Sequence, residues 1–146
     1  MRSTKYPVTI ALTFLWIGFV CAISFMEAWL KFQAPGITLE LGLGIGKLVF
    51  NALNKVEWAL AIIIIIHTLL SRQSIFKGKY LLISLVVFIL TIQSFWLLPA
   101  LFERANMHIE AQSVSSSSFA HYTYIAVEVI KIIALTLFGV SLLRNK

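Results

Sequence analysis

The chain has 146 residues and a formal net charge of +6, and 60% of its residues are apolar whereas only 12% are charged. Soluble domains are about one-quarter charged, so this composition argues against a water-soluble fold. The lysines and arginines form no basic stripe with interleaved aromatic residues, which argues against a nucleic-acid partner.

Four apolar segments predict membrane-spanning helices. Their approximate bounds are residues 7–32, 48–71, 80–104 and 118–143. Each is near or above the roughly 20 residues that cross a bilayer as a helix, and only helices satisfy their own backbone polar groups at these lengths. We therefore predict a single domain of the all-α membrane class, an antiparallel four-helix transmembrane bundle.

The first segment is expected to be a retained helix and not a cleaved signal peptide. It is too long, it keeps large residues where a small-residue cleavage site would lie, and it contains Glu27 and Lys31. The single cysteine, Cys21, excludes an internal disulfide, and its apolar neighbours indicate an inert packing residue.

The link between the first two segments, Gln33–Gly46, is too apolar for a free loop. We expect it to lie against the outer membrane surface or to fold over the bundle, where Gly42, Gly44 and Gly46 permit close backbone approach. A phosphate-binding loop is not expected, because no strand precedes Lys47 and no Ser or Thr follows it. Later in the chain, Pro99 predicts a kink in the third helix.

Lysine and arginine counts beside the segments predict that both termini are cytoplasmic. The cytoplasmic set is Arg2, Lys5, Arg72, Lys77, Lys79, Arg144 and Lys146. The opposite set is smaller: Lys31, Lys47, Lys55 and Arg104. This N-in/C-in orientation places a multi-pass protein in the cell membrane, which would be the inner membrane in a bacterium.

Polar residues from all four helices fall at similar depth in the predicted outer half. At about 1.5 Å per residue, Glu57 and Glu128 lie roughly 14 Å below the outer helix ends, level with Gln93 and near Ser24. The candidate ligand-binding or proton-binding residues are Glu57, Glu128, Lys131, His121, Tyr124, Asn54, Asn51, Glu27 and Gln93. They predict a polar funnel that narrows from the outside.

Spacing supports a shared interior face for these residues. His121, Tyr124, Glu128 and Lys131 recur at intervals of three, four and three residues, which places them on one stripe of a helix. A charge at mid-bilayer must face the bundle and find a partner, so Lys131 is expected to pair with Glu128 or with Glu57. Glu27 and Lys31 can pair one helical turn apart. Such polar groups also hold membrane helices together without any further function.

The histidines and glutamates of the predicted helices bear on two kinds of cofactor site, a haem site and a metal site. A haem held by His67 and His121 is excluded because the two lie about 24 Å apart along the bundle. A hard metal could be ligated by Glu27, Glu57, Glu128 and His121, but the Glu-x-x-His pairs of di-iron bundles are absent and Lys131 would compete for the carboxylates. We therefore expect no metal, and the sequence names no other cofactor.

Two resemblances bear on function. Asn54-Lys55-Val56-Glu57 resembles the Asn-x-x-Glu element of the four-helix membrane enzymes of eicosanoid and glutathione metabolism, but Phe50 stands where that family has arginine and the predicted orientation is opposite. Most of the chain resembles small four-helix bacterial membrane proteins of unknown function. The matching pieces are Gly18, Lys31-Phe32, Leu98-Pro99 and His121. That resemblance implies transport or export and transfers no site residue, since Glu57 and Glu128 lie outside the family pattern.

The sequence thus favours a membrane protein that binds or transports a small solute or ion at an outward-facing polar site. Two alternatives remain open: a membrane-embedded enzyme acting on a lipid or quinone, and an accessory subunit of a membrane complex. The expected partners are membrane lipids and a small-molecule or ion ligand, and the small size of the chain leaves homo-oligomerisation open.

Overall fold

The structure is a computed structural model that describes residues 6–71, 78–111 and 119–144, except for the side chains of 108–111 and 119–121. The elements in chain order are α1 (Pro7–Val20), η1 (Cys21–Glu27), α2 (Ala28–Leu30), η2 (Lys31–Gln33), α3 (Leu39–Leu70), α4 (Tyr80–Ile92), η3 (Gln93–Leu97), α5 (Leu98–Ala111) and α6 (Phe119–Arg144). Of these, η1 and η3 are π-helical and η2 is a 3-10 turn. Within the described residues the fold is all-helical.

The elements join into four continuous helices that are long and apolar enough to cross a membrane. These candidate spans are Pro7–Gln33, Leu39–Leu70, Tyr80–Met107 and Tyr122–Arg144. The prediction of four apolar helices is therefore confirmed.

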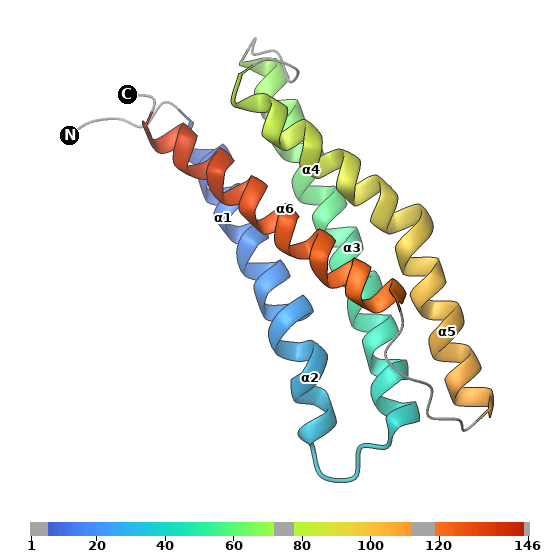
Figure 1. Ribbon diagram of the computed structural model, residues 1–146. Coiled ribbons are helices and arrows are strands. Elements are labelled where there is room, and N and C mark those ends of the chain that lie inside the picture. Colours follow the sequence, from blue (N-terminus) through green and yellow to red (C-terminus); the bar gives the residue numbers. More distant parts are fainter. Residues whose placement is uncertain (1–5, 72–77, 112–118, 145–146) are drawn as a thin grey trace.

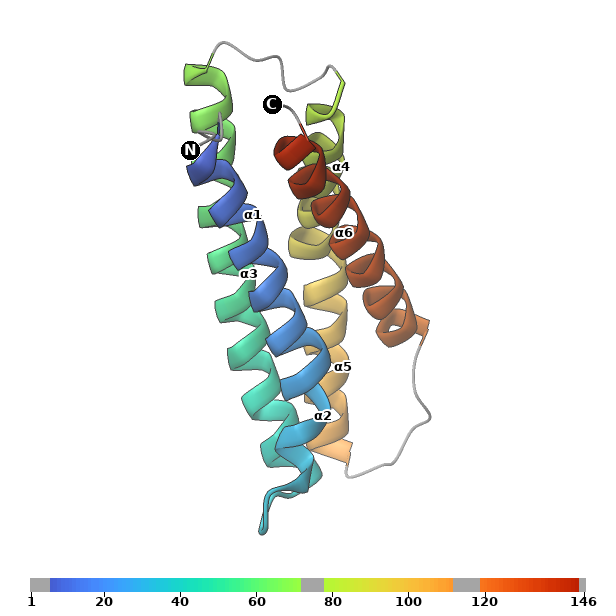
Figure 2. The same ribbon diagram turned by 90° about the vertical axis from the view of Figure 1, so that its left-hand side faces the viewer.

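The four helices lie side by side along one long axis (Figures 1 and 2). One end, at the top of both views, holds the start of α1, the end of α3, the start of α4 and the end of α6. The other end holds α2, the start of α3 and the end of α5. Because α6 begins part-way along the bundle, the lower end is framed mainly by the other three helices.

Apolar side chains form the core in the upper part of the bundle. Its buried members include Trp16, Val20, Ala61, Ile64, Val86, Leu90, Leu135 and Phe138. Many large apolar side chains face outward instead, among them Leu70 at 79% exposure and Phe95 at 78%. An apolar exterior around an apolar core is what a lipid solvent requires of a helical bundle.

The second helix begins earlier than predicted, at Leu39 instead of residue 48. The Thr38 hydroxyl caps it by accepting a hydrogen bond of 3.2 Å from the Leu41 N–H. Most of the predicted link is therefore helical, and only residues 34–38 connect the two helices. The chain reverses there at Pro35 and Gly36, where a φ of +80° at Gly36 suits a type II turn.

The third helix ends later than predicted, at Ala111 instead of residue 104. Pro99 does not stop it, because the π-helical segment η3 ends at Leu97, two residues before the proline. Proline has no N–H to donate to the carbonyl of Phe95, four residues earlier, and its ring would clash with that carbonyl in a regular α-helix. The wider π-helical turn makes room for the ring. The predicted irregularity at Pro99 thus appears as a π-helix inside a continuous helix.

Candidate functional site

Three charged side chains from two helices meet inside the bundle. The Lys131 Nζ lies 2.5 Å from Oε1 of Glu57 and 3.1 Å from Oε2 of Glu128. Lys131 and Glu128 are fully buried, and Glu57 is 2% exposed. Lys131 therefore contacts both of the carboxylates that the sequence offered as alternative partners.

Two neutral donors complete this group. The Gln93 side chain accepts a hydrogen bond of 2.9 Å from Lys131 and donates one of 3.1 Å to Oε1 of Glu128. The Trp16 Nε1–H donates to Oε1 of Glu57 at 2.8 Å. We call these five residues, Trp16, Glu57, Gln93, Glu128 and Lys131, the ionic cluster. It joins α1, α3, η3 and α6.

One carboxylate oxygen of the ionic cluster lacks a hydrogen bond. Oε2 of Glu128 is closed to solvent and contacts Lys131 as an ion pair, but no described residue donates a hydrogen bond to it. The Ser24 hydroxyl is likewise buried without a hydrogen-bond partner among the described residues. The Tyr124 hydroxyl faces both Ser24 and Glu128. Nearly all buried polar atoms in proteins are hydrogen-bonded, so a buried polar atom without a hydrogen bond calls for a physical explanation, and a role in binding is one.

Both π-helical segments contribute to this region. η1 contains Ser24, and η3 begins at Gln93. A π-turn widens the helix by one residue and re-aims its side chains, and such turns often occur at functional sites. The two irregular segments therefore supply polar groups beside the regular helices α3 and α6.

A cavity of about 350 Å³ lies next to the ionic cluster, in the lower half of the bundle. Its walls come from the end of the first span, from α3, α5 and α6. They comprise Ser24, Phe25, Ala28, Trp29, Lys31, Phe32, Gly42, Leu43, Gly46, Lys47, Phe50, Leu98, Leu101, Phe102, Ala105, Tyr124 and Ile125. Ser24 and Tyr124 belong to this wall and also face Glu128 or its neighbours, so the cavity adjoins the ionic cluster.

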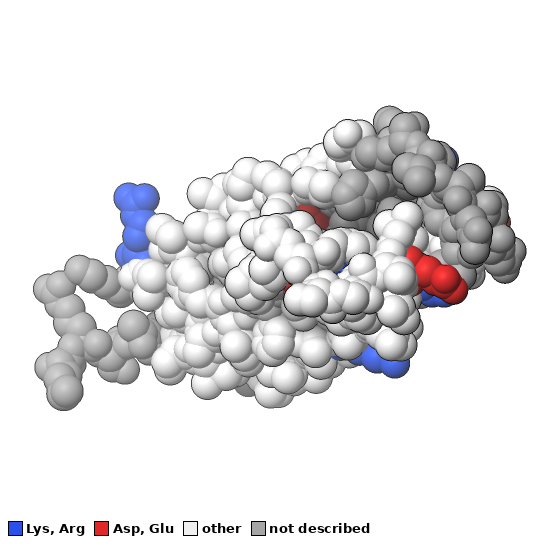
Figure 3. All heavy atoms as spheres, turned by 90° about the horizontal axis from the view of Figure 1, so that it is seen from below, with Lys and Arg blue, Asp and Glu red and all other residues white. Residues whose placement is uncertain are grey.

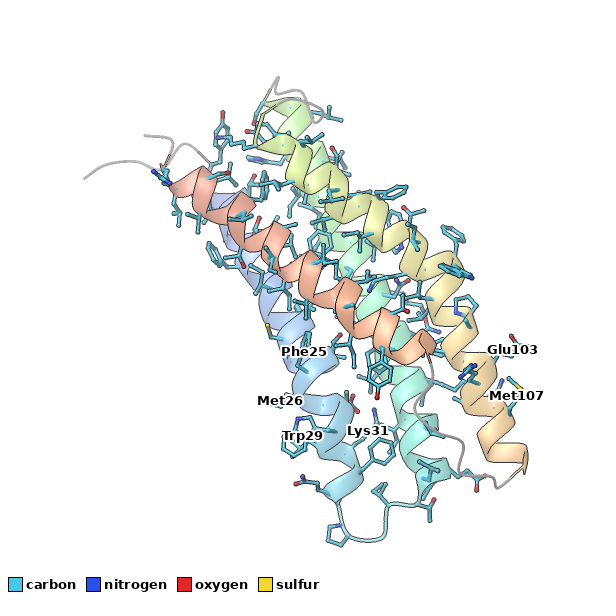
Figure 4. The ribbon with its side chains drawn as sticks, in the orientation of Figure 1. Phe25, Met26, Trp29, Lys31, Glu103 and Met107 are labelled. Carbon is cyan, nitrogen blue, oxygen red and sulfur yellow. The ribbon has the colours of Figure 1, made fainter. Side chains whose placement is uncertain are left out.

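Lys31 reaches into this space from the first span. Figure 4 shows its side chain pointing toward α3, whereas Met26 lies on the outer side of the same helix. Its Nζ lies 3.2 Å from Oε2 of Glu27, which confirms the predicted pair, and 5.4 and 5.6 Å from the ring centroids of Phe32 and Phe50. Cation–π contacts of this kind stabilise an ammonium group that is largely removed from water.

The opposite wall carries a second ammonium group. The Lys47 Nζ donates a hydrogen bond of 2.5 Å to Oδ1 of Asn106 and lies 5.9 Å from the Phe102 ring centroid. Seen from this end of the bundle, most of the visible described surface is uncharged; charged side chains lie near its margins, and a few acidic and basic atoms show between uncharged side chains near the middle (Figure 3).

Two of the three glycines expected to allow close approach do so. A Cβ at Gly42 would come within 2.1 Å of the Phe32 ring, and one at Gly46 within 2.9 Å of the Lys31 Nζ. A Cβ at Gly44 would meet nothing within 4 Å. Gly42 and Gly46 therefore make room for Phe32 and Lys31 at the cavity wall.

The structure does not bring all the predicted site residues together. The Asn54 side chain donates to the Ser94 hydroxyl at 2.7 Å, away from the ionic cluster. Asn51 is exposed. Three residues of an α-helix fall about 60° short of a full turn, so Asn51, which is six residues before Glu57, points about 120° away from it around the helix axis. Glu27 reaches the site only through Lys31. The side chain of His121 lies outside the described residues.

Two contributors were missed in the sequence. Trp16 is not among the site residues that the sequence predicts, yet its indole N–H binds Glu57. Ser94 accepts hydrogen bonds from both Asn54 and Trp58, the latter at 2.9 Å. The signal for Trp16 was available, since a buried tryptophan needs an acceptor for its N–H. No comparable signal marked Ser94.

In the part of the chain that the structure describes, no three His, Cys, Asp or Glu side chains gather as a metal site would require. Comparisons with known protein families, known proteins and solved structures found no match to the chain.

Proposed function

We propose that this protein is an antiparallel four-helix bundle of the cell membrane, with both termini in the cytoplasm, that binds and transports a small solute through its outward-facing cavity. The observation that carries the proposal is the contact between the cavity wall and the ionic cluster, made through Tyr124 and Ser24. An ionisable group buried at membrane depth beside a cavity is typical of a transport pathway.

The charges of the ionic cluster support a role in proton binding. Two carboxylates, Glu57 and Glu128, face a single ammonium, Lys131, and no other charged side chain among the described residues contacts them. An unbalanced buried charge costs several kcal/mol, so the cluster favours one bound proton or one cation. Glu128 is the carboxylate to test, because it faces Tyr124 at the cavity wall.

The direction of opening follows from the positive-inside rule. Arg144 at the end of α6 and Lys79 directly before α4 lie at the end of the bundle opposite the cavity. Basic residues mark the cytoplasmic side, so the cavity would open outward. In the other half of the bundle, Thr13, Thr68 and Ser71 donate hydrogen bonds to backbone carbonyls one turn earlier, and a 2.8 Å contact between Thr9 and His67 joins α1 to α3.

Proton movement in liposomes tests this proposal. The purified protein is reconstituted with a trapped pH-sensitive dye, and a pH step is imposed. We expect the wild-type protein to dissipate the gradient faster than empty liposomes and Glu128→Gln to fall to the empty-liposome rate. Glu103→Gln is the matched control, since Glu103 is an exposed carboxylate on α5. Equal rates for the two variants, or no protein-dependent rate at all, would contradict the proposal.

A second candidate is a membrane-embedded enzyme acting on a lipid or quinone. The observation in its favour is the apolar and aromatic character of the cavity, with Phe25, Phe50 and Leu101 in its walls. Extraction of the purified protein and analysis of the bound lipids and quinones separates the two. Chemical conversion of a bound lipid or quinone would favour the enzyme, and release of unchanged molecules would favour transport.

A further inference from the structure

The walls of the cavity are far more apolar than a site for a bare ion requires. Six aromatic side chains contribute to them: Phe25, Trp29, Phe32, Phe50, Phe102 and Tyr124. An inorganic ion is held by polar ligands at short range, whereas small-molecule sites are mainly hydrophobic with a few placed polar groups. The cavity therefore fits a ligand with a substantial apolar part.

Volume limits the size of that apolar part. The cavity measures about 350 Å³, near the lower end of the roughly 300–1,000 Å³ found for small-molecule sites. This space suits one short alkyl chain or a small ring system. A phospholipid with two long chains would not fit inside it.

The charged groups on the cavity wall are predominantly positive. Lys31 and Lys47 both line the cavity, and each ammonium lies near an aromatic ring. The described carboxylate that pairs with them is Glu27, which contacts Lys31, while Lys47 binds the neutral Asn106. Among these groups, two cations against one anion leave an excess positive charge in a poorly hydrated place, where its field is strong, while Glu57, Glu128 and Lys131 do not line the cavity.

The position of Lys31 is held by its surroundings. Its side chain is 9% exposed, its ammonium lies near both the Phe32 and Phe50 rings, and Gly46 leaves the space that it occupies. An ammonium fixed in this way needs little rearrangement to meet an anion, which lowers the entropic cost of binding.

We infer that the ligand of this cavity is a single-chain amphipathic carboxylate, with its head at Lys31 and Lys47 and its apolar part among the aromatic rings. The inference rests on the proposed function, because it presumes that the cavity binds a small solute. An amphipathic cation would instead be repelled at the lysines, and a neutral alcohol would gain nothing from them.

Thermal stabilisation by three matched probes tests the inference. Decanoate, decanol and decyltrimethylammonium share one chain and differ in the charge of the head. Each is added at equal mole fraction to the full-length protein in a nonionic detergent, since a ligand that binds the folded state raises the melting temperature. We expect decanoate to stabilise most. Equal stabilisation by decanol, or greater stabilisation by decyltrimethylammonium, would overturn the carboxylate assignment.

Substitutions test whether decanoate binding depends on Lys31. Lys31→Met is expected to weaken decanoate binding roughly tenfold, as for loss of a charge-assisted hydrogen bond. Glu27→Gln should strengthen it, because the competing carboxylate is removed. Lys55→Met is the matched control, since Lys55 is exposed and does not line the cavity. A loss of binding in Lys55→Met as large as in Lys31→Met would overturn the assignment.

Filling the cavity separates failure of this inference from failure of the proposed function. Ala28→Phe and Leu101→Trp each add volume to the wall and should abolish binding of every probe, whereas Ala126→Phe on an exposed face of α6 should not. Suppose that wild type binds decanol and decanoate equally and that Ala28→Phe and Leu101→Trp bind neither. The cavity then binds solutes without selecting carboxylates, so the proposed function stands and this inference fails. If no probe distinguishes Ala28→Phe and Leu101→Trp from Ala126→Phe, the cavity binds none of them and both proposals fail.

Discussion

The Lys131 ammonium lies 2.5 Å from Oε1 of Glu57, with the lysine fully buried and the glutamate 2% exposed, although the two residues belong to α6 and α3. A buried charge is costly without a partner of opposite sign, so the ammonium of α6 and the carboxylate of α3 each allow the other to be buried. Glu128 and Gln93 share the same ammonium. The folded state therefore depends on this ammonium.

Replacing Lys131 by methionine should strongly destabilise the protein. The change leaves Glu57 and Glu128 facing each other without a cation, and breaking a buried ion pair on one side costs about 3–5 kcal/mol. Thermal unfolding in detergent measures the loss. The triple variant Lys131→Met, Glu57→Gln, Glu128→Gln should recover much of it, because no buried charge remains. A Lys131→Met protein as stable as exposed Lys55→Met would contradict this interpretation.

Trp16→Phe should reduce stability by about 1–3 kcal/mol. The substitution keeps an aromatic ring in the core but removes the N–H that donates to Glu57 at 2.8 Å, so a buried acceptor loses a partner. Trp96→Phe is the control, since Trp96 is 66% exposed. Chemical unfolding of the two variants side by side gives the difference. If both lie within experimental error of wild type, the indole N–H contributes nothing to the ionic cluster.

Gly42→Ala should destabilise the protein relative to Gly44→Ala. The added methyl group would come within 2.1 Å of the Phe32 ring, whereas at Gly44 it meets nothing within 4 Å. We expect a difference of about 1–3 kcal/mol, the usual cost of overpacking. Combining Gly42→Ala with Phe32→Ala should remove that difference. A double variant no more stable than Gly42→Ala alone would show that the ring is not the obstacle.

Much of the fold could be predicted from composition alone. Apolar runs long enough to cross a bilayer leave little choice except helices, and the four runs appear as four helices. The residues at which the helices begin and end were less predictable near glycine and proline. The sequence predicts that Gly42 and Gly46 lie in the link between two helices, yet they lie inside α3, where Phe32 and Lys31 pack against them. That contact is tertiary, so the local sequence does not reveal it.

The ionic cluster was largely predictable because charge at membrane depth demands a partner. Counting residues placed Glu57, Gln93 and Glu128 at one level, and the structure brings them within reach of Lys131. The cavity was not predictable in the same way. Aromatic residues such as Phe50 and Phe102 are common in every membrane helix, and only their arrangement around a shared space distinguishes these from lipid-facing ones.

Cysteine accessibility at Ser24 tests the central claim most directly, namely that a cavity open to the outer face reaches the ionic cluster. In a Cys21→Ala background, Ser24→Cys is exposed to a membrane-impermeant thiosulfonate reagent from either side. Ala34→Cys in the turn before α3 reports the outer side, and Arg144→Cys at the end of α6 reports the cytoplasmic side.

We predict that Ser24→Cys reacts from the outside together with Ala34→Cys and is protected from the inside, where Arg144→Cys reacts. Prior reaction should also block the proton movement that depends on Glu128. Reaction of Ser24→Cys only from the cytoplasmic side, or no reaction from either side while both reporters react, would contradict the account.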